Sequence, residues 1–408
     1  MGTRDFTNPF KPGAGHMPPY LAGRKKETEE FLQLLEQTVI LDNMVLTGLR
    51  GVGKTVLLDT FKPLAIKNRW LWVGTDLSES ASVSEETIAL RFLTDLAVVT
   101  SNISIKSKRG NAIGFIPDKS RADRNLNFST LTELFNSIPG LVSDRLKGIL
   151  EFVWDCLRLQ NKRGIIFAYD EAQTVNDHPD KEQYPLSLLL DVFQSIQKKN
   201  IPFMLVLTGL PTLFPKLVEA RTFAERMFGI VFLDKLNPLE CKDAITKPIE
   251  TAKCPIKFIN DSIELIIKES GGYPYFIQFI CREVYDVFLQ NVKEGKHLKV
   301  PMDEIIIKLD KDFFSGRWAK VTDRQRELLA AIARLGNCQE EFSVHEAVEM
   351  SKKHLSNPFS SSHVNQMLGS LTNAGLIYKN RHGKYSFAVP LLDRFIMRQN
   401  IEGVVGIG

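Results

Sequence analysis

The segment 48–55, which reads GLRGVGKT, limits the possible folds of this chain more than any other stretch. It matches the pattern G-x-x-x-x-G-K-[ST], and it lies between a strand-like run at 44–47 and a helical run at 56–62. Glycines allow such a loop to bend until its N–H groups face phosphate oxygens, and the following helix adds the positive end of its dipole. The segment therefore predicts a phosphate-binding loop between a buried strand and a helix.

We expect this loop to bind ATP or ADP together with Mg²⁺. Lys54 would hold the β and γ phosphates, and the hydroxyl of Thr55 would bind the metal ion. Arg50 either contacts a phosphate or lies in solvent, and of the two we favour solvent. The residues expected to contact the nucleotide in this segment are Gly48, Gly51, Val52, Gly53, Lys54, Thr55 and Val56.

Two carboxylates follow an apolar run further along the chain. Residues 165–169 form a β-rich apolar run, and Asp170 and Glu171 come directly after it. In parallel sheets the ligand binds at the carboxyl ends of the strands, so these side chains would lie at the nucleotide. Without the loop at 48–55 the pair would indicate only a solvated strand end. With it, Asp170 is the expected Mg²⁺ ligand and Glu171 the expected base for the attacking water.

Three further residues are candidates for contact with the γ-phosphate. Thr208 ends the strand-like run 201–208, where its hydroxyl could sense hydrolysis, although a helix cap is an equal alternative. Arg221 and Arg226 precede the last strand-like run, at 230–233. Either arginine could reach the site of a neighbouring subunit as an arginine finger, and the sequence does not choose between them. For each of them a solvated helix face is the alternative.

The order of apolar runs predicts the architecture. Strand-like runs alternate with amphipathic stretches, which is typical of a parallel sheet covered by helices, and they lie at 44–47, 70–75, 164–169, 201–208 and 230–233. Helical patterns replace them later, at 238–252, 260–270, 274–291 and 302–314. At 408 residues the chain is too long for one core, and four parts are predicted: an extended segment 1–23, a P-loop α/β core 24–236, a helical lid 237–318 and a winged helix-turn-helix 319–408.

One connection within the predicted core is unusually long. Residues 101–143 exceed the normal length of a connection between elements and contain several lysines and arginines. The runs 103–107 and 112–116 flank the tetrapeptide KRGN, which predicts a β-hairpin with a basic tip.

Composition excludes several other classes of protein. Lys and Arg number 52 against 48 Asp and Glu, so the net charge of +4 neither requires nor excludes a nucleic-acid partner. Five scattered cysteines predict neither disulfides nor a zinc site, and the seven histidines have no metal-ligand spacing. No apolar run reaches the roughly 20 residues of a membrane span, and the start of the chain has no apolar signal core, so we expect a cytoplasmic protein without a membrane partner.

The C-terminal part predicts a winged helix. Helical patterns at 323–335, 344–354 and 361–374 precede two strand-like runs, 376–380 and 384–389, that a short turn joins. The third helix has an apolar face at helical spacing and an outward polar face. This face and the wing would contact duplex DNA through base edges and phosphates, with His363, Asn365, Gln366, Lys379, Arg381 and Lys384 as contacts. The third helix has no Lys or Arg, so a domain that docks protein is the alternative.

Together these motifs resemble the AAA+ and STAND branches of the P-loop ATPases, in particular archaeal and bacterial ATPases that are similar to origin-recognition initiators. The likeness covers residues 8–398 and includes the sequence LAGR at 21–24 before a helix. It implies that the segment before the first helix wraps the adenine, with residues 20–24, beginning at Tyr20, in contact with the base. It also implies assembly into a homo-oligomer, in which an arginine of one subunit completes the site of the next.

One place departs from the initiator pattern. Initiator-like proteins carry an arginine early in a lid helix, whereas residues 271–275 of this chain read GGYPY. This sequence resembles the Gly-x-Pro lid motif of STAND ATPases, which implies that Pro274 packs near the nucleotide. A glycine helix stop, followed by proline in the first turn of the next helix, explains the same residues without a ligand.

We therefore expect a protein that binds and hydrolyses ATP and whose nucleotide state controls assembly and DNA association through the winged helix. The alternative is a nucleotide-dependent signalling switch in which the winged helix packs or docks a protein partner. A scaffold that binds nucleotide without hydrolysing it is least favoured, because it would need no positioned base such as Glu171.

Overall fold

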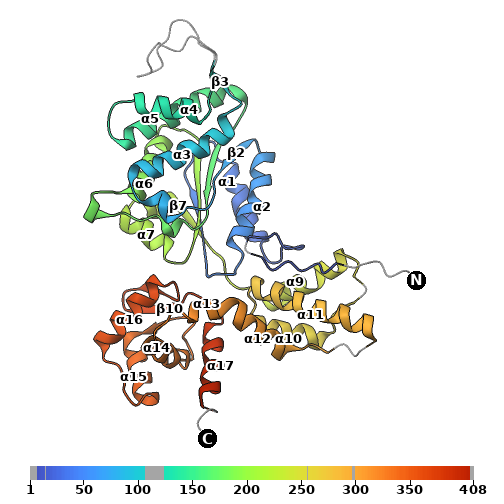
Figure 1. The fold of residues 1–408 in the computed structure, drawn as a ribbon. Helices are drawn as coiled ribbons and strands as arrows, with labels where there is room; N and C mark the ends of the chain where they lie inside the picture. Colours follow the sequence, from blue (N-terminus) through green and yellow to red (C-terminus); the bar gives the residue numbers. More distant parts are fainter. Residues whose placement is uncertain (1–6, 14, 106–123, 255, 296–298, 405–408) are drawn as a thin grey trace, which may run out of the picture. The chain divides into compact units, whose positions relative to one another are not determined.

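A computed structural model describes residues 7–13, 15–105, 124–254, 256–295 and 299–404 of the chain (Figure 1). The chain folds into two compact units. The sheet unit comprises Lys25–Thr47 and Leu57–Phe232, and the helical unit comprises Met1–Arg24, Gly48–Val56 and Leu233–Gly408. The phosphate-loop motif thus belongs to the helical unit, while the strand before it and most of the helix after it belong to the sheet unit.

The sheet unit is built on five parallel strands in the order β2-β5-β6-β1-β7. Three of them are buried along their whole length, which explains their continuous apolar sequences. Because β6 lies between β1 and β5, its carboxyl end separates the end of the phosphate-loop strand from the end of the strand before Asp170. The strands are β1 (Asn43–Thr47), β2 (Trp70–Val73), β5 (Gly164–Tyr169), β6 (Phe203–Gly209) and β7 (Phe228–Phe232).

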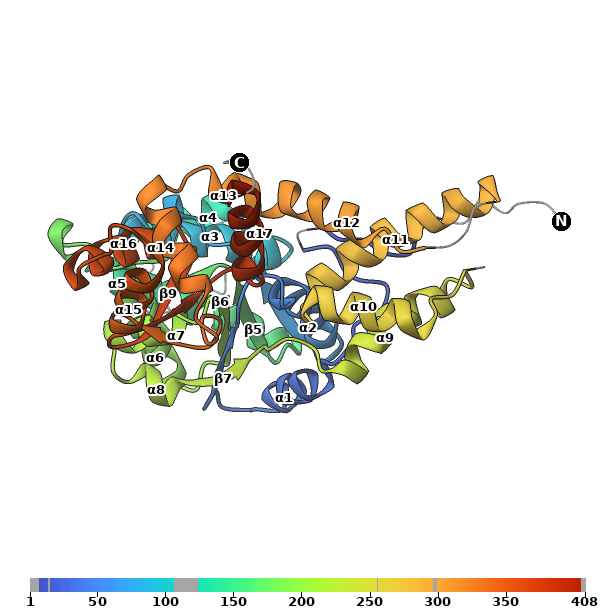
Figure 2. The same cartoon turned by 90° about the horizontal axis from the view of Figure 1, so that it is seen from below.

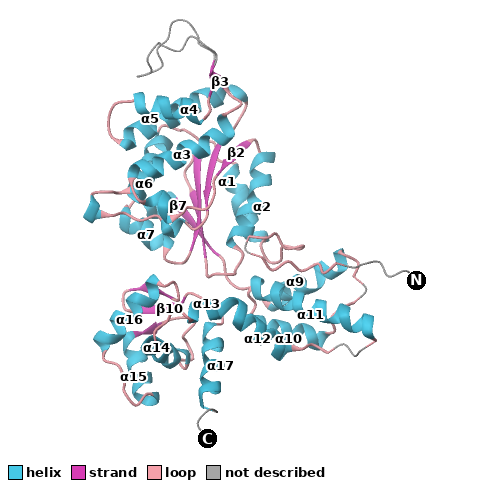
Figure 3. Cartoon of the chain, viewed as in Figure 1, coloured by secondary structure: helices cyan, strands magenta, loops and turns pink. Residues whose placement is uncertain are grey.

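Helices cover both faces of this sheet (Figure 3). On one face α1 and α2 pack together through stacked Phe31 and Phe61, whose ring centroids are 4.1 Å apart. On the other face Phe92, Phe167 and Phe193 form a fully buried cluster with centroid distances of 5.1–5.7 Å. The helices are α1 (Lys25–Leu35), α2 (Lys54–Lys67), α3 (Glu85–Thr100), α4 (Phe128–Ser137), α5 (Val142–Leu157), α6 (Pro185–Lys198), α7 (Leu213–Ala220) and α8 (Ala224–Met227).

The long connection at 101–143 differs from its prediction. β3 (Ser104–Ile105) pairs antiparallel with β4 (Arg124–Asn125), whereas the predicted second strand at 112–116 and the basic tip lie outside the described residues. The later part of the connection is α4 and not a loop. Its Asn127 side chain caps the helix by accepting a hydrogen bond from Thr130, and Leu131 is fully buried on its inner face.

The helical unit contains the predicted lid helices (Figure 2). α9 (Pro238–Thr251), α10 (Asn260–Ser270) and α11 (Pro274–Glu294) pack against one another. α12 (Met302–Leu309) continues through a π-helical turn (Asp310–Phe314) into α13 (Ser315–Trp318). In the N-terminal segment, Phe10 is buried against Phe258 and Tyr285, with both centroid distances at 6.3 Å.

The C-terminal part of the same unit is a winged helix with more elements than the sequence predicted. The three predicted helices are α14 (Asp323–Ala333), α15 (Val344–His354) and α16 (Ser361–Asn373), and the predicted strands are β9 (Ile377–Arg381) and β10 (Lys384–Phe387). The wing sheet has a third strand, β8 (Phe342–Ser343), in the order β8-β10-β9, and a last helix, α17 (Leu392–Val404), packs on α14. The predicted two-stranded wing is therefore wrong by one short strand.

These observations confirm the expected fold class: a P-loop α/β sheet between helices, a helical lid and a winged helix. Among the helices of the described ranges, none has both the length and the apolar character needed to cross a membrane.

Asn43 provides a stability test, because it joins three strands at the start of β1. Its buried Oδ1 accepts a hydrogen bond from Leu205 of β6 at 2.8 Å, and its Nδ2 donates to the carbonyl of Met227, next to β7, at 3.0 Å. Asn43→Ala should lower the free energy of unfolding by about 3 kcal/mol, because both backbone groups lose their partner. Urea unfolding measures this, with Asn68→Ala at the end of α2 as a control. The role of Asn43 in joining the strands would be contradicted if Asn43→Ala lost no more unfolding free energy than Asn68→Ala, whose side chain donates to the carbonyl of Leu64.

Candidate functional site

The phosphate loop follows β1 with the backbone that its glycines permit. Gly51 and Gly53 have φ angles of +80° and +92°, in the left-handed region that other residues rarely adopt. A side chain at Gly48 would place its Cβ 2.4 Å from the carbonyl oxygen of Leu233, so this position accepts only glycine. Val52 is buried with 1% of its surface exposed, which anchors the middle of the loop.

Lys54 begins α2, and its side chain folds back over the loop. Its Nζ donates to the carbonyl oxygens of Gly48 at 2.9 Å and Leu49 at 3.0 Å, and only 8% of the residue is exposed. The ammonium group therefore lies within the loop that precedes it, where a phosphate would meet both the charge and the start of the helix. Thr55 and Val56 follow in the first turn of α2 and are half-buried.

Arg24 supports this loop, a role that the sequence did not reveal. It is buried, and its Nη2 donates to the carbonyl oxygen of Val52 at 2.9 Å and to that of Asp234 at 2.8 Å. The resemblance named the segment around Tyr20 for contact with adenine. Tyr20 is half-buried and lies near Lys247 of α9. Arg24 belongs to the region 20–24, for which the resemblance implied contact with adenine and not support of the loop.

The lid contributes a hydrogen bond to the phosphate loop. Pro274 is the first residue of α11, and the N–H of Tyr275 donates to the carbonyl oxygen of Gly51 at 3.1 Å. Because proline has no N–H, Tyr275 offers the first available donor of the helix. Gly271 ends α10 in the left-handed conformation, so the local explanation of this sequence also holds.

Arg50 is not the solvated side chain that we favoured from the sequence. It is half-buried, and its Nη1 donates to the carbonyl oxygen of Gly375 at 2.8 Å, between α16 and β9 of the winged helix. Gly375 has a φ of +67°, and a Cβ there would lie 3.2 Å from Nη1. Arg317 of α13 is also close, since burial and then the Arg50 charge lower the pKa of Arg317.

The sheet unit brings Thr208 and Asp170 together. Asp170 follows β5 and is 4% exposed, and Thr208 near the end of β6 is fully buried. The Thr208 hydroxyl donates to Oδ1 of Asp170, and the N–H of Glu171 donates to the same oxygen at 2.8 Å. Thr208 is not a helix cap, because Thr212 precedes α7.

Glu171 lies at a turn that fixes its backbone. Its φ is +52°, which is uncommon for a residue with a side chain and marks local strain, and its side chain is exposed. Gln173 donates to the Glu171 carboxylate from the following turn (Ala172–Thr174). Lys216 of α7 donates to the backbone carbonyl of Gln173, and neither residue was singled out from the sequence.

The residues around Asp170 fit a magnesium ion. Asp76 forms a parallel bridge with Asp170, and burial raises the pKa of Asp59 on α2, with Lys62 opposing and the Asp170 and Asp76 carboxylates adding to the rise. Such a concentration of carboxylates favours a divalent cation. In the described ranges no group of three His, Cys, Asp or Glu side chains could hold a metal by itself.

The two candidate finger arginines differ in their surroundings. Arg221 forms a two-pronged ion pair with Asp191, with distances of 2.7 and 2.8 Å, and also donates to Ser187. This pairing holds Arg221 within its own unit. Arg226 is exposed on α8.

The surface of the winged helix carries the residues proposed for DNA contact. His363, Asn365 and Gln366 are exposed on α16, while Val364 and Leu368 on the same helix are fully buried, as the helical spacing predicted. On the wing Lys379 is exposed as well.

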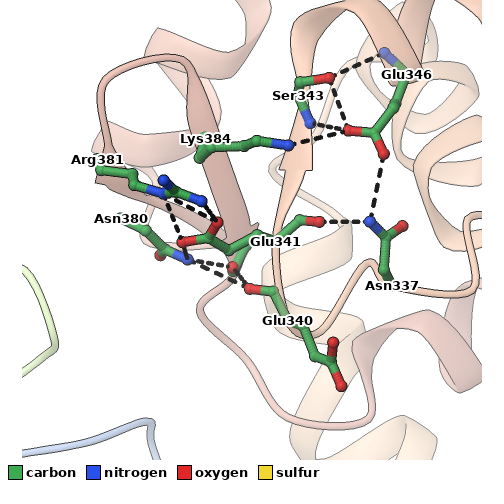
Figure 4. A network of polar contacts seen from close by, with 9 residues as sticks. Asn337, Glu340, Glu341, Ser343, Glu346, Asn380, Arg381 and Lys384 are labelled. Atoms are coloured by element: carbon green, nitrogen blue, oxygen red, sulfur yellow. Dashed lines mark hydrogen bonds and ion pairs between the residues drawn. The ribbon is translucent and has the colours of Figure 1, made fainter.

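The other two wing cations are engaged in ion pairs (Figure 4). Arg381 contacts the Glu341 carboxylate through Nη2 at 2.8 Å and Nε at 3.1 Å, and Lys384 lies 3.5 Å from Glu346. Hydrogen bonds from Arg381 and then Asn380 hold the pKa of Glu341 below its usual range. These acids neutralise much of the positive charge that the sequence assigned to the wing.

Comparisons with known proteins bear on the fold. Residues 311–396 match a family described as a domain of unknown function, DUF8462. No curated protein matches the sequence. The fold is similar to that of a Walker-type ATPase of Pyrococcus abyssi, with 16% identity and a TM-score of 0.56 over 92% of this chain and 96% of that one. It is also similar to the ORC2 protein of Aeropyrum pernix in its ADP form, with 14% identity and a TM-score of 0.55 over 95% and 97% of the two chains.

Lys216 should make the stability of the protein depend on pH. Burial lowers the pKa of Lys216 to about 8, with Asp177 and Glu219 opposing, whereas an unfolded lysine titrates near pH 10.4. The folded state therefore disfavours the charged amine below pH 8, and this cost disappears as the pH rises from 8 to above 10. Relative to Lys216→Met, the wild type should gain stability between pH 8 and 10 in urea unfolding. A difference between the two proteins that stays constant over this range would contradict the prediction.

Proposed function

We propose that this chain is a nucleotide-binding ATPase whose nucleotide state is communicated to its winged helix, through which it associates with duplex DNA. The observation that carries the ATPase part is the glycine-bent loop 48–55 with Lys54 folded over it at the start of α2. This combination of backbone, charge and helix start suits the β and γ phosphates of a nucleotide. Two solved structures with a similar fold, a Walker-type ATPase and an ORC2 protein in its ADP form, agree with the proposal.

Hydrolysis would depend on the phosphate loop and on the two carboxylates that follow β5. Lys54 would neutralise charge on the phosphates, and Thr55 and Asp170 would hold Mg²⁺, which when bound withdraws charge from the phosphate oxygens. Glu171 would accept the proton of the attacking water. Thr208, hydrogen-bonded to Asp170, would lie at the strand end that faces the γ-phosphate. In a homo-oligomer Arg226 is a better candidate for an arginine finger than Arg221. Arg226 is exposed, whereas the ion pair with Asp191 holds Arg221 in place.

Communication with the winged helix rests on Arg50. This residue belongs to the phosphate loop and donates to Gly375, which lies directly between the proposed DNA-contacting helix and the first wing strand. The nearby Arg317 repels Arg50, so an anionic γ-phosphate would attract the Arg50 guanidinium away from Gly375. Tyr275 adds a second connection, since its helix N-terminus donates to Gly51. The presence of a γ-phosphate would thereby alter the contacts of the winged helix.

DNA contact would use mainly the exposed face of α16. Asn365 and Gln366 can each pair with an adenine edge through two hydrogen bonds, and Lys379 can contact a phosphate. Because Glu341 and Glu346 already pair with Arg381 and Lys384, we expect fewer released counterions and a shallower salt dependence than the wing sequence alone suggests.

The proposal predicts ATP hydrolysis that duplex DNA stimulates. Lys54→Ala should abolish hydrolysis, because it removes the positive charge that would pair with the phosphates of the nucleotide. Glu171→Gln should reduce kcat by about 100-fold or more while ATP still binds, because only the base is lost. Steady-state phosphate release, measured across a titration of duplex DNA, tests both.

Controls separate the parts of the proposal. Hydrolysis that persists in Lys54→Ala would come from a contaminant and contradict the ATPase assignment. Hydrolysis that disappears in Lys54→Ala but does not respond to DNA would contradict the DNA partner and favour the alternative, in which the winged helix binds a protein. Asn365→Ala combined with Gln366→Ala should remove the stimulation without changing the DNA-free rate.

A further inference from the structure

Gln173 is placed to control the orientation of Glu171. The Glu171 backbone is fixed by its left-handed φ and by the hydrogen bond of its N–H to Asp170. Its side chain is exposed and would otherwise sample several rotamers. A base must point at the water that it activates, so the group that holds its carboxylate affects the rate.

The chemistry of the neighbours determines which way the Gln173 amide faces. Glu171 can only accept a hydrogen bond, and Gln173 donates to its Oε2 through Nε2. On the other side of the amide, the N–H of Leu210 can only donate, and it contacts Oε1 at 3.1 Å. If the amide were reversed, its oxygen would face the Glu171 carboxylate and its NH₂ group would face the N–H of Leu210, so neither hydrogen bond could form. Gln173 therefore bridges the Glu171 carboxylate and the backbone that follows β6.

Gly209 leaves the space that this bridge requires. A Cβ at Gly209 would lie 2.5 Å from Oε1 of Gln173 and 2.9 Å from a side-chain carbon of Leu213. Any larger residue at 209 would thus displace the amide. Lys216 fixes the other end, because its amine donates to the backbone carbonyl of Gln173.

The same strand end holds both carboxylates. Thr208 contacts Asp170 through its hydroxyl, and Leu210, two residues later, holds Glu171 through Gln173. We propose that Gln173 is a positioning residue that sets the direction of the Glu171 carboxylate and makes it depend on the conformation of residues 208–210. This inference rests on the proposed ATPase function, in which Glu171 is the base.

Three variants test the inference by steady-state kinetics. Gln173→Met removes both hydrogen bonds and should lower kcat about tenfold or more with little change in KM for ATP, because substrate binding does not use the amide. Gly209→Ala should have the same effect by expelling the amide. The double variant should lose no more than the single ones, since both act through one interaction.

Gln173→Glu separates positioning of Glu171 from a purely structural role. It keeps an acceptor for the N–H of Leu210 but loses the donor to Glu171 and places a second carboxylate beside it. If Gln173 only held the backbone of Leu210, kcat would stay at the wild-type value, whereas positioning of Glu171 predicts the same loss of kcat as in Gln173→Met. Gln194→Met on α6 is the matched control and should leave kcat unchanged.

The outcomes distinguish the two levels of the proposal. If the wild type hydrolyses ATP no faster than Lys54→Ala, both the proposed function and the role of Gln173 are overturned. If the wild type hydrolyses ATP while Gln173→Met or Gln173→Glu matches Gln194→Met in kcat, only the role of Gln173 is overturned. A lower kcat at constant KM in both variants supports it.

Discussion

The carbonyl oxygens of the phosphate loop need hydrogen-bond donors that leave its N–H groups available for phosphate. Distant parts of the helical unit supply them: Arg24 donates to Val52, Tyr275 at the start of α11 donates to Gly51, and Lys54 donates to Gly48 and Leu49. The loop is therefore supported by the N-terminal segment, by the lid and by its own lysine. Arg50 makes a contact in the opposite direction, because it belongs to the loop and donates a hydrogen bond to the carbonyl oxygen of Gly375 in the winged helix.

The order of the strands imposes a comparable constraint on the sheet unit. Since β6 lies between β1 and β5, Thr208 reaches Asp170 directly, and the backbone after β6 reaches Glu171 through Gln173. One strand end thus fixes both acids. A change in the conformation of residues 208–210 would therefore alter the surroundings of both Asp170, the proposed Mg²⁺ ligand, and Glu171, the proposed base.

Local sequence patterns predicted most of this fold, and contacts between distant residues account for the rest. Residues that are close together in the sequence determine the loop at 48–55, the buried strands and the apolar face of α16. A local sequence pattern can therefore predict each of these elements. The bond between Arg50 and Gly375 joins residues 325 positions apart, and no local pattern reports it. The ion pair of Arg381 with Glu341 is similar, since charge alone indicated a basic wing. The strand β8 was too short to produce an alternating pattern.

We propose that Arg50 communicates the nucleotide state of the phosphate loop to the winged helix. Amide hydrogen exchange of residues 374–378, measured on the full chain saturated with ADP or with a non-hydrolysable ATP analogue, tests this role of Arg50. We expect faster exchange with the ATP analogue, because Arg50 leaves the Gly375 carbonyl, and no difference between the two nucleotides in Arg50→Met. Equal exchange in the wild type with both nucleotides bound, or a difference that persists in Arg50→Met, would contradict it.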